Sequence, residues 1–408
     1  MDMAHLSPGT TPERLHALDG VRAGALLLGV LFHASLSFLP GGQIWVVRDA
    51  PSDALGMFSF VAHIFRMAAF FLIAGYFGRM LLARRGPGGF VRNRLVRVAL
   101  PLLVFWPIVL AGIVATFVWG AATMAGGSLP PGPPPPPPTL ATFPLTHLWF
   151  LYVLLLFYTA ALAIRALASL VDRPGRFRGG IDRGMRALSA TPAAPLFLAA
   201  PLAAALAVRP DWHAWGGIPT PDTGFLPNMA ALAGYGTAFA FGWLLHRQTG
   251  LLEQIRRWWA VQLAAAILLS IACWVQLASV PASAPMPAGS TRTLFACLYA
   301  LAVWTWTLGL TGAALRFLTR ERPGVRYLAD ASYWIYLMHL PVVMALQVAI
   351  YPVAAPGLAK WALVCLGAFL ILVASYHLLV RHSWLGRWLN GRKLPWRGSA
   401  PVLETHKA

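Results

Sequence analysis

The chain has 408 residues, of which 58% are hydrophobic and only 11% are charged, whereas soluble globular proteins carry about a quarter charged residues. A soluble core of this size cannot bury so much apolar surface, which excludes a soluble globular enzyme. The net charge of +19 comes from 32 Lys and Arg against 13 Asp and Glu. Because these basic residues cluster in short gaps between apolar runs, they indicate membrane topology rather than nucleic-acid binding.

Apolar runs of roughly 20 residues, the length that crosses the hydrocarbon core of a bilayer, recur along the chain. The first ten residues lack the basic region of a cleavable signal, so we expect the first run to be retained as a helix. Ten segments qualify or nearly qualify, and the fifth is short: 17–39, 55–82, 97–120, 147–168, 194–208, 226–246, 258–280, 293–318, 332–352 and 358–380. The sequence therefore predicts an all-α polytopic membrane protein of about ten transmembrane helices.

Basic residues alternate between the predicted loops. The loops after the second, fourth, sixth and eighth spans and the C-terminal tail each hold three or more, whereas the intervening loops hold at most one. Since basic loops face the cytoplasm, this alternation predicts that both termini are cytoplasmic. The predicted organisation is a cytoplasmic segment at 1–16, a membrane domain at 17–381 and a basic cytoplasmic tail at 382–408.

The longest predicted external loop, 121–146, contains an unbroken run of prolines from 133 to 138. Such a run adopts the extended polyproline II conformation and acts as a stiff spacer. A ligand for an SH3-like partner is the alternative interpretation of this segment.

Ionisable side chains at membrane depth are costly and therefore mark candidate functional positions. In the first span, His33 follows Arg22 after three helical turns plus about 20°, so both lie on one stripe, roughly 16 Å apart. Asp19 precedes Arg22 by one turn and can pair with it. In the alternative interpretation, Arg22 reaches the lipid headgroups and His33 is a packing residue with one hydrogen bond.

The second and fourth spans carry similar residues. His63 and Arg66 lie one turn apart in the predicted outer half of the second span, and an arginine at that depth must face a cavity or a partner. His147 opens the fourth span beside Trp149. Its alternative interpretation is an interfacial residue next to the tryptophan belt.

The ninth span has a polar stripe, because Tyr333, Tyr336 and His339 follow one another at three-residue steps. For the two tyrosines, packing between helices is the alternative interpretation. The stripe would place a histidine and two phenol groups on one face of the helix.

Several common chemistries have no counterpart in the sequence. No Asp or Glu lies well inside a predicted span, which argues against carboxylate-driven proton pumping. The chain has no phosphate-loop lysine motif, no H-E-x-x-H zinc site and no G-x-S-x-G elbow, and its three cysteines show no pairing or ligand spacing. Neither a metal nor a bound cofactor is expected. Histidines with arginines suit general-base catalysis on a hydroxyl, with cationic groups holding an anionic substrate.

Four blocks of sequence together resemble the acyltransferase-3 family of membrane-bound O-acyltransferases, and within it the glucan biosynthesis protein C-like branch. The blocks are Leu18 to His33, Arg66 to Phe77 followed by Arg94, Arg97 and Pro101, His147 to Phe150, and Ser332 to His339. Ala74 departs from the pattern, because many members carry serine before the glycine at this point, so no hydroxyl role is expected there.

The resemblance implies a multi-pass enzyme of the bacterial inner membrane that moves an acetyl or succinyl group from acyl-coenzyme A to a carbohydrate hydroxyl of the envelope. By position, His33 would be the general base, or less favourably a transient acyl carrier, and Arg22 would assist it or contact the donor. Arg94 and Arg97 would hold coenzyme A phosphates on the cytoplasmic side. The remaining residues would bind substrate: His63, Arg66, His147, Tyr333, Tyr336 and His339.

Two other functions remain open from the sequence. A transporter or flippase for an anionic lipid or sugar would use the same arginines without chemistry, and would be expected to show inverted repeats and short broken helices. A sensor or scaffold without turnover would tolerate replacement of the intramembrane histidines.

Overall fold

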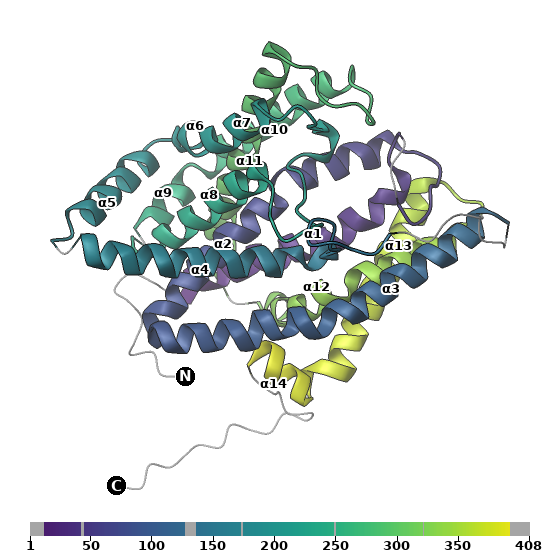
Figure 1. Cartoon of the computed structure of the whole chain (residues 1–408), viewed down its shortest axis with the longest axis horizontal. Coiled ribbons are helices and arrows are strands. Elements are labelled where there is room, and N and C mark those ends of the chain that lie inside the picture. Colours follow the sequence, from purple (N-terminus) through teal and green to yellow (C-terminus); the bar gives the residue numbers. More distant parts are fainter. Residues whose placement is uncertain are drawn as a thin grey trace, which may run out of the picture.

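The computed structural model describes residues 12–41, 45–126, 136–172, 174–248, 250–320 and 322–391. Within these ranges the chain is helical and contains no strand apart from an isolated bridge between Pro144 and Thr223. The helices form one bundle (Figure 1). Residues 127–135 of the predicted external loop and residues 392–408 of the predicted basic tail lie outside the described residues.

Fourteen α-helices are formed by the described residues. The first seven are α1 (Pro12–Ser35), α2 (Asp53–Arg94), α3 (Leu100–Met124), α4 (Trp149–Val171), α5 (Arg176–Ser189), α6 (Ala194–Leu198) and α7 (Ala200–Ala207). The others are α8 (Met229–Leu245), α9 (Leu251–Arg257), α10 (Trp259–Leu277), α11 (Ser290–Phe317), α12 (Pro323–Ile350), α13 (Gly357–Ser375) and α14 (Trp384–Asn390). Short 3₁₀ segments are η2 (Leu36–Phe38), η4 (Thr146–Leu148) and η5 (Ala214–Gly216), and π-helical segments are η3 (Leu95–Ala99) and η6 (Tyr376–Arg381).

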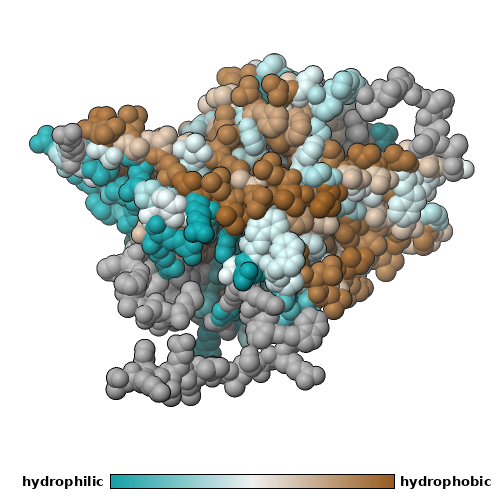
Figure 2. All heavy atoms as spheres, turned by 60° about the horizontal axis from the view of Figure 1, so that its bottom comes forward, coloured by the Kyte–Doolittle hydropathy of each residue, from teal (hydrophilic) through white to brown (hydrophobic). Residues whose placement is uncertain are grey.

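Seven helical segments in the described part of the chain are long and apolar enough to cross a membrane. They are His16–Phe38, Asp53–Met124, Thr146–Val171, Trp259–Leu277, Ser290–Phe317, Pro323–Ile350 and Gly357–Arg381. Large apolar side chains on their outer faces are exposed, for example Leu103, of which 71% is accessible. In Figure 2, hydrophobic side chains form a broad band across one face, with hydrophilic ones gathered beside it. The prediction of an all-helical, multi-pass membrane protein is therefore confirmed.

The segment Asp53–Met124 contains a sharp turn. Its 72 residues would extend about 108 Å as one straight helix, several times the thickness of a hydrocarbon core of about 30 Å. Gly86 has the non-helical angles φ 66° and ψ 178°, a left-handed conformation that favours glycine, and Pro87 follows it. The chain runs along α2 and returns along α3 (Figure 1), so this one segment corresponds to the second and third predicted spans.

The fifth predicted span, 194–208, does not form one long helix. It is divided into α6 and α7, which have five and eight residues. Pro201 lies at the start of α7, and a proline ring clashes with the carbonyl four residues earlier and lacks an N–H to donate. The proline therefore gives a physical reason for the interruption. The sixth predicted span appears as α8, which has 17 residues.

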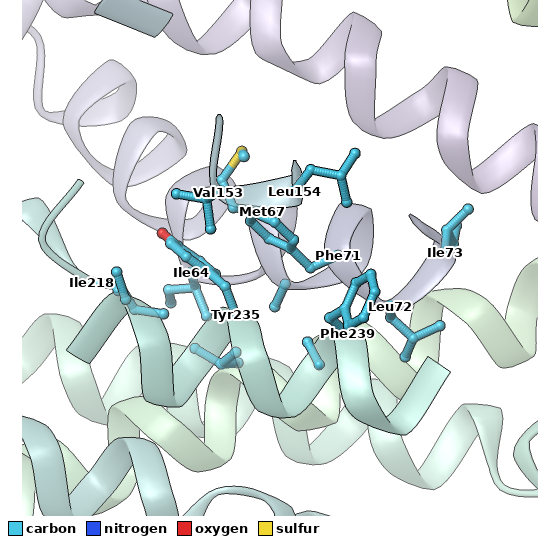
Figure 3. Packing of buried hydrophobic residues seen from close by; sticks show 14 of the residues in the cluster. Ile64, Met67, Phe71, Leu72, Ile73, Val153, Leu154, Ile218, Tyr235 and Phe239 are labelled. Carbon is cyan, nitrogen blue, oxygen red and sulfur yellow. The ribbon is translucent and has the colours of Figure 1, made fainter. Parts of the chain in front are cut away.

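Helices α2 and α8 pack against each other at the centre of the bundle. A Cβ atom on Gly75 would overlap the carbonyl oxygen of Phe239, and one on Gly242 would overlap that of Leu72. Small residues at such a crossing let two backbones approach closely. Figure 3 shows the apolar side chains beside this contact, where the rings of Phe71 and Tyr235 stack with centroids 5.0 Å apart.

This close contact leads to a prediction about stability. We expect Gly242→Ala to lower the unfolding temperature in detergent, because overpacking a tight contact costs about 1–3 kcal/mol. Gly236→Ala on the same helix is the matched control, since its new Cβ would lie 3.6 Å from the Phe157 ring, an ordinary van der Waals distance. Equal unfolding temperatures for the two variants would contradict the assigned packing.

Candidate functional site

A cavity of about 620 Å³ lies between α1, α2, α12 and the segments that connect the helices at one end of the bundle. Connecting residues such as Pro40, Trp215 and Ala282 contribute to its wall. Six of the residues singled out from the sequence line it: His33, His63, Arg66, His147, Tyr336 and His339. The cavity therefore gathers polar groups from four segments that are far apart in the sequence.

Three histidines form a row along the cavity. The ring centroids of His33 and His339 lie 5.1 Å apart, and those of His339 and His147 lie 4.9 Å apart. His33 comes from the last turn of α1, His339 from the middle of α12 and His147 from η4. His63 also lines the cavity, with its ring stacked on that of Phe32 at a centroid distance of 5.1 Å.

Hydrogen bonds fix the tautomers of two of these rings in their neutral form. The Nε2 atom of His147 lies 3.1 Å and 3.3 Å from the carbonyl oxygens of Tyr336 and Leu337, and carbonyls only accept, so Nε2 is the donor. The Nδ1 atom of His339 donates to the carbonyl of Tyr336 at 2.7 Å. The Nε2 atom of a neutral His339 is then an acceptor. The arrangement can therefore accept a proton from a bound hydroxyl group.

Arg66 places a positive charge against the cavity wall. Only 7% of the residue is exposed, and its guanidinium carbon lies 4.3 Å from the centroid of the Phe32 ring. Gly29 leaves the space for it, because a Cβ there would lie 3.2 Å from an Nη atom. No carboxylate of the described residues lies within 4 Å of the guanidinium. A buried charge without a partner is costly, and here it is available to an anion.

A connecting segment between α1 and α2 covers His33. The indole of Trp45 stacks on the His33 ring, with centroids 6.1 Å apart and planes 12° apart. The segment is held by a buried ion pair in which Lys360 Nζ lies 2.8 Å from Asp49 Oδ2. Lys360 also donates to the carbonyl of Tyr351. Sequence reasoning missed Trp45 and Asp49, because both lie in a loop without a regular pattern.

A second connecting segment, 208–228, forms another part of the wall. Asp222 is the only carboxylate among the described lining residues, and loss of water around its carboxyl group raises its pKa. The carbonyl of Asp222 accepts from the N–H of Leu145, and the indole N–H of Trp215 donates to the carbonyl of Val280. The sequence offered no signal for either residue, because their positions depend on how the loop folds over the bundle.

Four of the residues predicted from the sequence do not line this cavity. Arg22 pairs with Asp19 at 3.1 Å, which confirms that predicted contact, and 38% of its side chain is exposed. Tyr333 donates its hydroxyl to the carbonyl of Arg97 at 2.8 Å. Arg94 donates to the hydroxyl of Tyr158 at 3.1 Å.

Their separation from His33 follows from helix geometry. Arg22 shares a stripe of α1 with His33, but a stripe runs the whole length of a helix, whereas α1 lines the cavity only from Ala25 onward. Arg94 ends α2 and Arg97 follows it in η3, at the end of α2 opposite to His63. These arginines therefore belong to the basic end of the bundle.

Comparison with known proteins gives one family and one group of relatives. The sequence model of a family described as an acyltransferase domain matches residues 15–380. Glucans biosynthesis protein C of Escherichia coli O1:K1 is 37% identical over 151 residues, which cover 36% of this chain and 38% of the relative, and the same protein of strain O139:H28 gives the same values. The match thus spans well under half the length of these relatives. No solved structure matches the chain.

Proposed function

The chain belongs to the acyltransferase-3 family, and we propose that it is a membrane-bound O-acyltransferase that moves an acetyl or succinyl group from acyl-coenzyme A to a hydroxyl of an envelope carbohydrate. Family membership supports the acyl transfer. The printed name of the relatives, glucans biosynthesis protein C, supports a carbohydrate acceptor. The observation that carries the proposal is the row of three histidines in one cavity beside a buried Arg66 that has no carboxylate partner among the described residues.

We propose ten spans with both termini in the cytoplasm of a bacterium, in its inner membrane. Six of the seven long apolar segments count once each, and Asp53–Met124 counts twice because the chain turns at Gly86. The apolar helix α8 and the interrupted pair α6 and α7 supply the remaining two. Arginine-rich loops at one end support this orientation, which puts the cavity in the outer half of the membrane.

The proposed reaction uses the cavity residues in distinct roles. The acceptor hydroxyl binds in the cavity, and His33 removes its proton as the oxygen attacks the thioester carbonyl of the donor. Arg66 stabilises the negative charge that develops on the carbonyl oxygen. The carbon–sulfur bond then breaks, the coenzyme A thiolate leaves, and the proton held by His33 passes to the thiolate. His63, His147, Tyr336 and His339 position the acceptor.

The donor is proposed to bind from the basic end of the bundle. Both Nη atoms of Arg94 already donate to protein groups, Tyr158 and Asn93, so Arg97 is the better candidate for a phosphate ligand. Arg22, exposed at the same end, is proposed to contact the donor rather than His33. Tyr333 acts through Arg97, whose backbone it holds.

This assignment predicts a change in donor affinity. Arg97→Ala should raise the KM for acyl-coenzyme A by about 10- to 100-fold with little change in kcat, because a charge-assisted hydrogen bond contributes about 1.5–3 kcal/mol. The matched control is Arg92→Ala, an exposed arginine near the same end of the bundle, for which the KM should not change. An unaltered KM in Arg97→Ala would show that the donor binds elsewhere.

The function itself is tested by transfer from labelled donors. Purified protein in detergent is given radiolabelled acetyl- or succinyl-coenzyme A together with an envelope glucan extract, and label on the glycan is measured. Label from either donor supports the proposal and identifies the acyl group. No label from either, with folded protein, contradicts it and favours a transporter that uses the same cavity without chemistry.

A further inference from the structure

Gln347 is a buried amide in α12 that uses both ends of its side chain. Only 1% of the residue is exposed. Its Nε2 atom donates to the carbonyl oxygens of His33 at 3.1 Å and Ala34 at 3.0 Å, and its Oε1 atom accepts from the indole N–H of Trp45 at 3.0 Å. This one side chain therefore connects α12, the end of α1 and the segment that covers the cavity.

The carbonyls that Gln347 binds are those that need a partner. Helix α1 ends at Ser35, and the last carbonyls of an α-helix have no partner within the helix. By accepting from Gln347, the carbonyls of His33 and Ala34 are satisfied and the last turn of α1 is tied to α12. Helix α12 also carries His339, about two turns before Gln347. The backbone beneath His33 and the neighbouring histidine are thus both held by α12, in which Pro341 lies between His339 and Gln347.

The side-chain oxygen of Gln347 acts on His33 through Trp45, which covers one face of the His33 ring. Trp45 stacks on the imidazole, and its indole N–H is held by Gln347. The Nδ1 atom of His33 is buried and has no hydrogen-bond partner among the described residues. A catalytic histidine is usually oriented by a group that binds its second nitrogen. Here stacking against Trp45 and a tilted contact with His339 restrain the ring.

We propose that Gln347 is a positioning residue for His33, which it holds through the helix backbone and through Trp45. The inference rests on the proposed function, in which His33 is the general base. Gln347 lies outside the cavity lining, so it acts through His33 and binds no substrate. Its loss changes the rate of the chemical step and leaves substrate binding unchanged.

The test compares kcat with KM in the full-length protein. In Gln347→Leu, kcat should fall by about 10- to 100-fold, the loss expected when a catalytic group is misplaced by about 1 Å, while both KM values stay within about twofold. In a His33→Ala background, Gln347→Leu should cause no further loss, because the two residues act as one unit. Unchanged kcat, or an equal further loss without His33, would overturn the inference.

Gln262→Leu is the matched control. Gln262 is also buried, with 4% exposed, and donates to a backbone carbonyl, that of Pro192 at 2.8 Å, away from the cavity. Its kcat should equal that of the parent, and an equal fall in both variants would indicate a general loss of structure. If Gln347→Leu does not fold, Trp45→Phe is measured instead, because it removes the N–H that Gln347 holds and keeps a smaller aromatic ring beside His33. A several-fold lower kcat supports the inference and an unchanged kcat overturns it. A parent protein without transfer activity would refute the proposed function, and the role of Gln347 with it.

Discussion

Replacing His33 with alanine is expected to lower kcat for acyl transfer by about 10²–10⁴-fold, the usual contribution of a positioned general base. The imidazole lies in the cavity between Trp45 and His339. Without it, the acceptor hydroxyl must lose its proton to water or to another ring. The measurement is transfer of labelled acyl groups to glycan by the purified variant, at saturating donor and acceptor.

His246→Ala is the control for this experiment. His246 is a buried histidine that lies after α8 and packs on the ring of Tyr76 at a centroid distance of 5.2 Å, outside the cavity. Its removal should leave kcat unaltered. A folded His33→Ala protein with the kcat of the parent would remove His33 from the mechanism, and the other histidines of the row would then be tested one at a time.

Replacing Arg66 with methionine is expected to change activity and stability in opposite directions. Transfer should fall by about 10²–10³-fold, as when an oxyanion donor is removed. The protein should nevertheless unfold at a higher temperature, because the substitution removes a buried charge that has no carboxylate partner in the described part of the chain. The contact with Phe32, worth about 2 kcal/mol when desolvated, offsets part of this gain. Methionine fills a similar volume beside Gly29 and leaves no large void.

The two readouts of this variant are activity and thermal unfolding in the same detergent. Arg66→Lys keeps the charge but loses the planar fork of donors, so it should show intermediate activity and no stabilisation. Arg165→Met, which replaces an exposed arginine of α4, should change neither quantity. A less stable Arg66→Met protein would show that the arginine serves the fold, and the proposed oxyanion role would lose its support.

The helices and many of the cavity residues could be predicted from the sequence. Polar side chains are energetically costly inside a membrane, so the few that occur within apolar runs mark candidate positions. His33, His63, Arg66 and His339 stand out only against apolar neighbours, and each lines the cavity. Gln347 is likewise a polar residue inside a predicted span, but an amide there is equally typical of helix packing, so the sequence alone does not mark it as a site residue.

The remaining features depend on tertiary contacts that no local pattern records. Trp45 and Asp222 lie in loops, where direction is set by the surfaces against which the loop folds. The division of 194–208 was also missed, because its composition is apolar throughout although Pro195 and Pro201 interrupt it. The stripe shared by Arg22 and His33 follows from helical periodicity, which fixes a face of a helix but cannot tell how far a cavity extends along it.

The close crossing of α2 and α8 has a consequence for biosynthesis. Roughly 170 residues separate Gly75 from Gly242, so at a synthesis rate of about 5–20 residues per second helix α8 emerges roughly ten to thirty seconds after α2. During this interval the groove at Gly75 of the nascent α2 lacks the helix that packs into it. The contact between α2 and α8 therefore forms only after the intervening helices have been made.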